Sequence, residues 1–127
     1  MKHLALAALL TAAATTASAE MTLSFDWGNI PLCTTGRPNI VPNPTFILKG
    51  VPKGTTSVTF RLKDLDVPSY SHGGGKVGIT GSGKVPPGYF KYKSPCPPSG
   101  QHTYEWTATA KAGNKTLTTA KARKKYP

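Results

Sequence analysis

The sequence predicts an all-β protein built from antiparallel strands, with little helix. Three observations carry this prediction. Short segments alternate between apolar and polar residues, which is the two-residue period of a half-buried strand. Stretches rich in proline and glycine separate these segments, as turns and loops separate strands. No window after residue 19 shows a convincing helical period.

The individual elements follow from this alternation. A first strand is expected over residues 21–27, and the Pro-, Gly- and Asn-rich residues 28–44 are expected to form a loop. Ala112, Gly113 and Asn114 separate the last two strands and predict a hairpin turn. The other predicted elements are a strand at 45–48, a turn at 49–54, a strand at 57–66, a loop at 69–75, weaker strands at 76–80 and 89–92, and strands at 102–111 and 115–123.

Residues 1–19 have the features of a secretory signal peptide. They begin with a basic residue, continue with an apolar run and end in Ala17-Ser18-Ala19, which matches an A-x-A-like cleavage site. We therefore expect a secreted or periplasmic protein in which residues 20–127 form a single domain.

Cys33 and Cys96 are the only two cysteines of the sequence. An even pair in a secreted chain predicts a disulfide, and two cysteines allow a single pairing. The alternative is a catalytic or metal-binding thiol, which an oxidising compartment disfavours. The predicted bond ties the N-terminal loop to the proline-rich segment around Cys96.

The composition is strongly basic, with 16 Lys and Arg against five Asp and Glu and a formal net charge of +11. This balance favours anionic partners, although a merely solvated cationic surface is the alternative. Basic residues are spread along the chain apart from the run at 121–125, which makes an anionic membrane surface a candidate partner. The sequence has no recognisable nucleic-acid module, so no specific nucleic-acid partner is expected.

Residues 78–85 nearly match the phosphate-binding loop of nucleotide hydrolases. The last position is Val85, which cannot bind Mg²⁺, and Pro86 and Pro87 prevent the helix that should follow. The sequence therefore excludes this class of enzyme.

Two predicted strands have polar ends that point to a shared pocket. The apolar face of the strand at 57–66 ends in Asp64 and Asp66, although an unpaired buried charge is expensive. His102 and Tyr104 begin a later strand, and the residues that follow them on the same face are apolar. Antiparallel pairing places these two strand ends side by side, so we predict that the four side chains form one polar pocket.

His72 lies between these strands and is followed by the three glycines of residues 73–75. It is either a further member of the pocket or a solvated loop histidine. Glycines in this position permit a positive φ or a close approach of the backbone to a ligand.

Several segments between residues 43 and 110 occur in a characteristic order. They are Asn43-Pro44-Thr45-Phe46, Gly50-Val51-Pro52-Lys53-Gly54-Thr55, Asp64-Leu65-Asp66-Val67-Pro68, His72 and Pro95-Cys96-Pro97-Pro98-Ser99-Gly100-Gln101-His102-Thr103-Tyr104. Together they resemble the phosphatidylethanolamine-binding protein family, and within it the bacterial Raf kinase inhibitor-like branch. The resemblance implies a β-sandwich with a small pocket for phosphate-type anions. The implied lining residues are Asp64, Asp66, Pro68, His72, Pro95, His102 and Tyr104.

The resemblance and the polar cluster predict a small-ligand-binding protein rather than an enzyme. The expected ligand is a phosphate-type anion or a phospholipid headgroup, and no catalytic residue, metal or cofactor is expected. No Ser or Cys nucleophile stands at a recognisable spacing. The alternatives are a protein-interaction module that inhibits a peptidase or kinase, a metal-dependent or acid–base hydrolase built on Asp and His, and a purely structural polar cluster.

Overall fold

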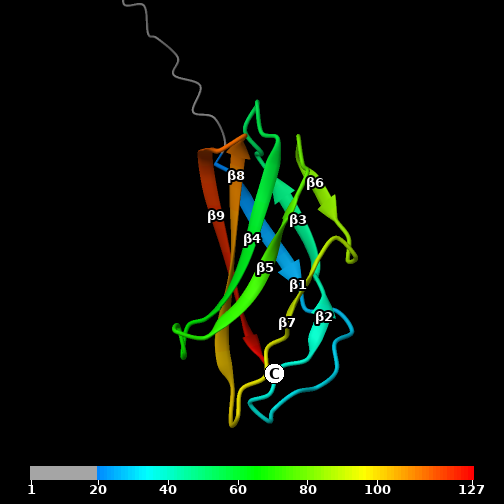
Figure 1. The fold of residues 1–127 in the computed structure, drawn as a ribbon, viewed down its shortest axis with the longest axis vertical. Coiled ribbons are helices and arrows are strands. Elements are labelled where there is room, and N and C mark those ends of the chain that lie inside the picture. The colour runs from blue at the N-terminus through cyan, green and yellow to red at the C-terminus, as the bar shows by residue number, and fades with distance from the viewer. Residues whose placement is uncertain (1–19) are drawn as a thin grey trace, which may run out of the picture.

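The structure is a computed structural model that describes residues 20–127 (Figure 1). The predicted signal peptide at residues 1–19 lies outside the described residues. Among residues 20–127, no helix is long and apolar enough to cross a membrane.

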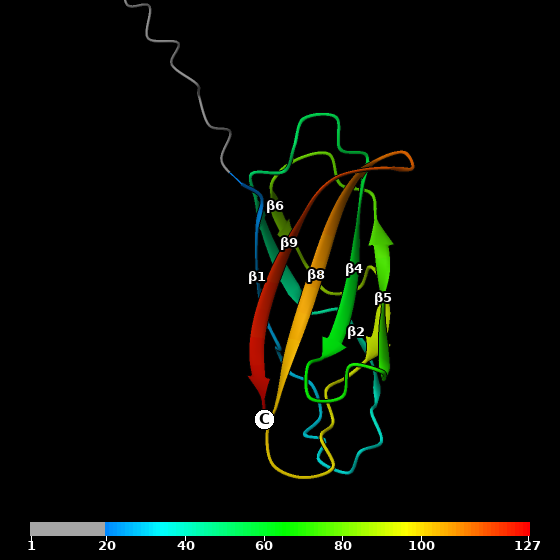
Figure 2. The same ribbon diagram turned by 90° about the vertical axis from the view of Figure 1, so that its left-hand side faces the viewer.

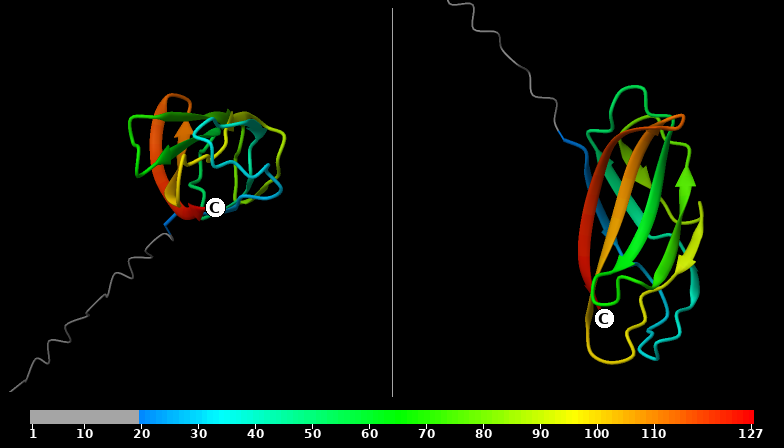
Figure 3. Two further views of the ribbon diagram at one scale, coloured as in Figure 1. Left: turned by 90° about the horizontal axis from the view of Figure 1, so that it is seen from below. Right: turned by 60° about the vertical axis from the view of Figure 1, so that its left-hand side comes forward.

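The described residues form nine strands in three antiparallel sheets. The strands are β1 (Thr22–Asp26), β2 (Ile40–Pro42), β3 (Thr45–Lys49), β4 (Ser57–Asp64), β5 (Ser71–Val77), β6 (Gly83–Val85), β7 (Lys91–Lys93), β8 (His102–Ala112) and β9 (Lys115–Tyr126). The largest sheet has the order β5-β4-β8-β9, the second has the order β1-β3-β6, and β2 pairs with β7. Figures 2 and 3 show the two larger sheets stacked as two layers. The predicted all-β antiparallel sandwich is confirmed.

The pairing of β4 with β8 is the centre of the largest sheet. The two strands pair along the whole of β4, and its last residue, Asp64, lies opposite Tyr104. The hairpin predicted between the last two strands joins β8 to β9, and Gly113 in its turn has a φ of +58°, which glycine adopts without strain. Asp64, His102 and Tyr104 therefore lie on the two central strands of this sheet.

Aromatic side chains join the two layers. Phe46 of β3 stacks on Phe60 of β4 with ring centroids 4.2 Å apart, and Trp106 of β8 meets Phe46 edge to face at 5.0 Å. All three side chains are fully buried. Burying a side chain of this size contributes roughly 1.5–3 kcal/mol, so this cluster is a main source of cohesion between the sheets.

The structure corrects the predicted end of the fourth strand. The strand ends at Asp64 and not at residue 66, because the Asp64 side chain accepts hydrogen bonds from the backbone amides of Asp66 and Val67 and so closes a turn. Asp66 is therefore exposed and does not extend the buried row of β4. The last strand was predicted to end at residue 123, but β9 extends to Tyr126. The buried ring of Tyr126 packs against Trp27.

Three further elements differ from the prediction. β2 lies within the segment predicted as the loop 28–44, and β6 was not predicted; strands of three residues are too short to show a period. β5 begins at Ser71, although residues 69–75 were predicted as a loop. Its three consecutive glycines carry no side chains, so they hide the alternation of that strand.

Gly74 and Gly75 allow β5 to pack closely against its neighbours. A Cβ atom at Gly74 would lie 1.8 Å from the carbonyl oxygen of Phe60, and one at Gly75 would lie 2.4 Å from the Phe90 ring. Gly73 has a φ of +78°, as the sequence allowed. At Gly74 and Gly75 the space next to the backbone is filled by protein, so the expected close approach to a ligand there is wrong.

The predicted disulfide between Cys33 and Cys96 is present. It joins the loop after β1 to the proline-rich segment before β8. The Thr35 amide donates a hydrogen bond to the Cys96 sulfur, and the Cys33 amide donates one to the hydroxyl of Tyr126. An intramolecular disulfide favours a compartment other than a reducing cytoplasm.

Replacing Gly74 by alanine should destabilise the protein by about 3 kcal/mol, because the new methyl group would meet a backbone carbonyl that cannot move aside. Gly78→Ala is the matched control, since nothing lies within 4 Å of a Cβ atom at that position. Urea unfolding measures both free energies. Equal stability of the two variants would contradict this account of β5.

Removing the disulfide by the double replacement Cys33→Ser and Cys96→Ser should lower the free energy of unfolding by about 4 kcal/mol. This value follows from the loop-closure entropy of cysteines 63 residues apart. Denaturant unfolding of the variant and the parent measures it. Thiol titration of the unreduced, denatured protein should detect no reactive thiol, and two per chain would show that the bond does not form.

Candidate functional site

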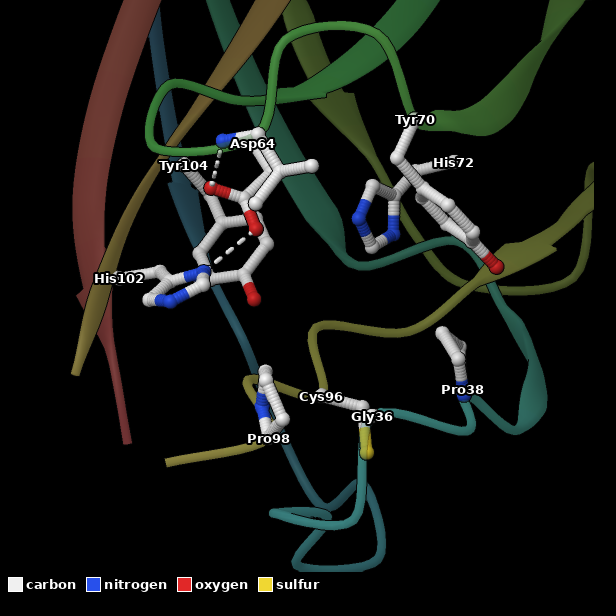
Figure 4. A pocket seen from close by; sticks show the side chains of 10 residues that line it. Gly36, Pro38, Asp64, Tyr70, His72, Cys96, Pro98, His102 and Tyr104 are labelled. Atoms are coloured by element: carbon white, nitrogen blue, oxygen red, sulfur yellow. Dashed lines mark hydrogen bonds and ion pairs between the residues drawn. The ribbon is translucent and has the colours of Figure 1, made fainter. Parts of the chain in front are cut away.

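A cavity of about 260 Å³ lies where the C-terminal end of β4 meets the beginning of β8 (Figure 4). The loop after β4, the start of β5 and the two loops joined by the disulfide complete its walls. The lining residues are Gly36, Pro38, Asp64, Val67, Tyr70, His72, Cys96, Pro98, His102 and Tyr104. The cavity is thus a mostly apolar pocket with a few polar groups, as small-ligand sites usually are.

Asp64 is the acidic residue of the lining, and its carboxylate is already engaged. Its Oδ1 accepts hydrogen bonds from the amides of Asp66 at 2.9 Å and Val67 at 3.3 Å, and its Oδ2 lies 2.6 Å from Nδ1 of His102. The residue is only 4% exposed. These three donors satisfy the buried charge, and they also fix the loop after β4 and the orientation of the histidine.

His102 is oriented by this carboxylate. A carboxylate accepts hydrogen bonds, so Nδ1 of His102 carries the proton of this contact and Nε2 is left for other partners. Figure 4 shows its ring beside Tyr104, and the two ring centroids are 6.3 Å apart. His102 can therefore present either a lone pair or, once protonated, an N–H group to a ligand.

His72 is a buried member of the cavity and not a solvated loop residue. It is 3% exposed, and its Nδ1 donates a hydrogen bond of 2.8 Å to the carbonyl oxygen of Lys93. The Tyr70 and Tyr104 rings pack against it edge to face at 4.7 and 5.4 Å. Burial lowers the pKa of His72, while the Lys93 carbonyl and the Asp64 charge act in the opposite direction.

Tyr104 is fully buried, and its ring lies next to the rings of both His72 and His102 (Figure 4). Burial and the nearby Asp64 carboxylate both raise the pKa of its phenol above the ordinary value. The hydroxyl therefore stays protonated at neutral pH and offers a neutral hydrogen-bonding group instead of a phenolate.

The seven residues predicted from the sequence separate into two groups. Asp64, His72, His102 and Tyr104 meet around the cavity, whereas Asp66, Pro68 and Pro95 do not line it. Asp66 instead accepts a hydrogen bond of 2.8 Å from the Thr103 amide and so holds the start of β8. Pro68 lies in the exposed turn after β4, and Pro95 is buried within the proline-rich segment. Of these three residues, Asp66 thus supports the start of β8 from outside the cavity.

Other lining residues were not identified as site residues from the sequence. Tyr70 and Val67 come from the loop after β4, and Gly36, Pro38 and Pro98 come from the loops that the disulfide joins. An aromatic residue two positions before His72 was a usable signal for Tyr70. Residues 36 and 38 carried no signal, because only the tertiary fold brings them to the cavity.

Asp64, Asp66 and His102 form the group of residues with metal-ligand chemistry in the described chain, with ligand atoms within 4.8 Å of one another. Within this group, Nδ1 of His102 is already bonded to Oδ2 of Asp64. The oxygens of both aspartates accept hydrogen bonds from backbone amides. A metal ion would have to replace these contacts, so the arrangement fits a hydrogen-bonded cluster better than a metal site.

No family model and no curated protein sequence matches the chain. Among solved structures, the chain is similar to CT736 from Chlamydia trachomatis, a proposed homologue of the phosphatidylethanolamine-binding protein. The TM-score is 0.57 at 18% sequence identity, and the match covers 87% of this chain and 99% of CT736. This likeness confirms the fold that the sequence resemblance implied, while the chemistry of the site rests on its own residues.

Replacing Asp64 by asparagine should lower the pKa of His72 further, because the negative charge that favours the imidazolium is lost while burial remains. An NMR titration of the histidine ring protons measures this, with His102→Gln identifying the His72 signal. In the parent protein the lowered pKa of His72 means that this group reduces folding stability as the pH falls below its ordinary value of 6.5. An unchanged or raised His72 pKa in Asp64→Asn would contradict the described electrostatics.

Proposed function

We propose that the protein is a secreted, non-catalytic binding protein whose cavity takes small ligands with a phosphate-type anionic group, such as a phospholipid headgroup. The observation that carries this proposal is the pairing of His72 and His102 around one cavity, each with its Nδ1 held by the protein and its Nε2 left over. Two nitrogens that become N–H donors on protonation, beside the Tyr104 hydroxyl, match the oxygens of a phosphate group.

The charge of this cavity depends on its histidines. Its lining contains Asp64 but no Lys or Arg, so positive charge within it comes from protonated imidazole. With both rings protonated, the lining carries a net positive charge despite Asp64. Anion binding and proton uptake are therefore coupled, and affinity should rise as the pH falls through the histidine range.

A neighbouring hollow adds fixed cations. It has a volume of about 330 Å³ and shares His72 with the cavity, and its lining includes Arg61, Lys91 and Lys93. Lys93 Nζ also lies 5.4 Å from the centre of the Tyr70 ring. A ligand that extends past His72 would meet these positive charges, which favours anionic over neutral ligands.

The chemistry of the lining supports binding rather than catalysis. Cys96 is part of the disulfide, Tyr104 is held as a neutral phenol, and the Asp64 carboxylate is occupied by three donors. None of these groups is an activated nucleophile. The same atoms serve a binding protein well, because each polar group is held in place before the ligand arrives.

Glycerophosphoethanolamine should bind more tightly at about pH 5 than at about pH 8, since its phosphodiester charge is constant while the histidines gain protons. At a concentration of about ten times the dissociation constant it should raise the free energy of unfolding by about 1.4 kcal/mol. Thermal shift and calorimetry measure these effects, and inorganic phosphate serves as a second probe that lacks the ethanolamine.

His102→Gln and His72→Gln should each weaken binding at the acidic pH about tenfold and flatten its pH dependence. Lys84→Gln is the control, because it removes a positive charge from the other sheet. Absence of binding at both pH values, or equal binding by all variants, would refute the proposal. Stronger binding at the higher pH, abolished by a chelator, would indicate a metal site instead.

A further inference from the structure

The outer face of the largest sheet carries an array of cations. Residues that lie opposite each other in neighbouring strands share a face, so Lys63 of β4, Glu105 of β8 and Arg123 of β9 form one row across the sheet. Arg61, Thr107 and Lys121 form the next row. We call this surface the basic face, and its cations are Arg61, Lys63, Lys76, Lys111, Lys121, Arg123 and Lys125.

At its paired positions the basic face has one carboxylate for seven cations. Glu105 accepts a hydrogen bond of 2.6 Å from Arg123 and lies 3.9 Å from Lys121, and these two side chains cover it. Within residues 20–127, the other five cations of the face take part in no ion pair; Lys111 is half-buried and the other four are exposed. A concentration of unneutralised charge of this kind attracts a polyanion.

Threonine hydroxyls fill the space between the cations. Thr59, Thr109 and Thr119 lie opposite one another on β4, β8 and β9, and Thr107 lies between Arg61 and Lys121. The paired positions of the face contain no aromatic side chain and no large aliphatic side chain. Hydroxyls can hydrogen-bond both to anionic groups and to the hydroxyls of a sugar.

The shape and composition of the face distinguish between classes of polyanion. Figure 2 shows that the strand direction changes from β9 to β5, so the cations follow a twisted surface and not a plane. A planar anionic bilayer meets only part of such a surface, and the paired positions of the face offer no large apolar side chain for insertion. Single-stranded nucleic acid is usually held by aromatic stacking, which the face lacks. A flexible, hydroxyl-rich polymer fits both the twist and the composition.

We propose that the basic face binds a linear acidic polysaccharide, whose repeated anionic groups pair with the cations of β4, β5, β8 and β9 and whose hydroxyls bond to the threonines. This site is separate from the cavity, because the two lie on opposite faces of β4 and β8, although Arg61 of the basic face also lines the hollow beside His72. Asp64 and Tyr104 point toward the inner layer, whereas Lys63 and Glu105 point outward. The protein would then hold to an anionic glycan layer while its cavity remains open.

Immobilised heparin, a sulfated polysaccharide, tests the proposal. The variant Lys63→Gln/Lys76→Gln/Lys125→Gln removes unpaired cations from three strands of the basic face. The control Lys49→Gln/Lys53→Gln/Lys84→Gln removes the same charge from exposed lysines of the other sheet and its turn. The parent and the control should elute at similar salt concentrations, and the face variant at a clearly lower one. The slope of log affinity against log salt should fall by roughly two for the face variant, taking about 0.7 per lost contact.

Several results would overturn the proposal. Equal losses in the face variant and the control would show that net charge alone causes retention. Failure of the parent protein to bind heparin would exclude the polysaccharide. Tighter binding to single-stranded DNA, or to phosphatidylglycerol vesicles, than to heparin would assign the face to a different partner. Thermal unfolding of both variants checks that the fold is intact, and binding of glycerophosphoethanolamine should be unchanged in both, which separates this site from the cavity.

Discussion

In the centre of the largest sheet, β4 and β8 pair along the whole of β4, and side chains that lie opposite each other share a face. The same register that buries Phe60 against Ala108 brings Asp64 beside Tyr104 at the end of the sheet. A buried carboxylate must then be satisfied, because an unpartnered charge in the interior is costly. The turn amides after β4 and the ring of His102 supply the partners. The loop, the histidine and the cavity wall therefore all depend on this one strand pairing.

The hydrogen-bond acceptors at the Nδ1 atoms determine which nitrogen of each cavity histidine carries the proton. A carboxylate holds His102 and a backbone carbonyl holds His72, and both acceptors require a proton on the nitrogen they contact. Burial lowers the pKa of His72, whereas the Asp64 charge raises it, so an anion in the cavity acts in the same direction as Asp64. The proposed binding of an anion would therefore be coupled to proton uptake, although no Lys or Arg lines the cavity.

Much of this arrangement could be predicted from the sequence because it depends on a two-residue period. That period identified the long strands β4, β8 and β9, and it brought Asp64 together with His102 and Tyr104. The even number of cysteines, together with the expected oxidising compartment, predicted the disulfide. The failures have physical causes as well: β2 and β6 are too short for a period, and the glycines of β5 have no side chains to alternate. Pro38 and Tyr70 reach the cavity through loops, and loop positions are decided by tertiary contacts that no local pattern records.

The basic composition has a different structural meaning from the one that a count of charges suggests. From the sequence alone, a net charge of +11 suggests that basic side chains line the predicted anion pocket, yet no Lys or Arg lines the cavity. The basic run near the C-terminus is divided by the strand period of β9. Lys121, Arg123 and Lys125 face outward with the cations of β4 and β5, while Lys124 turns inward and lies 5.8 Å from the Phe25 ring. Because side chains alternate along β9, only every second residue of the basic run joins the basic face. These residues form one edge of that face, on the edge strand of the sheet. The same strands therefore place the cavity and the array of cations on opposite faces.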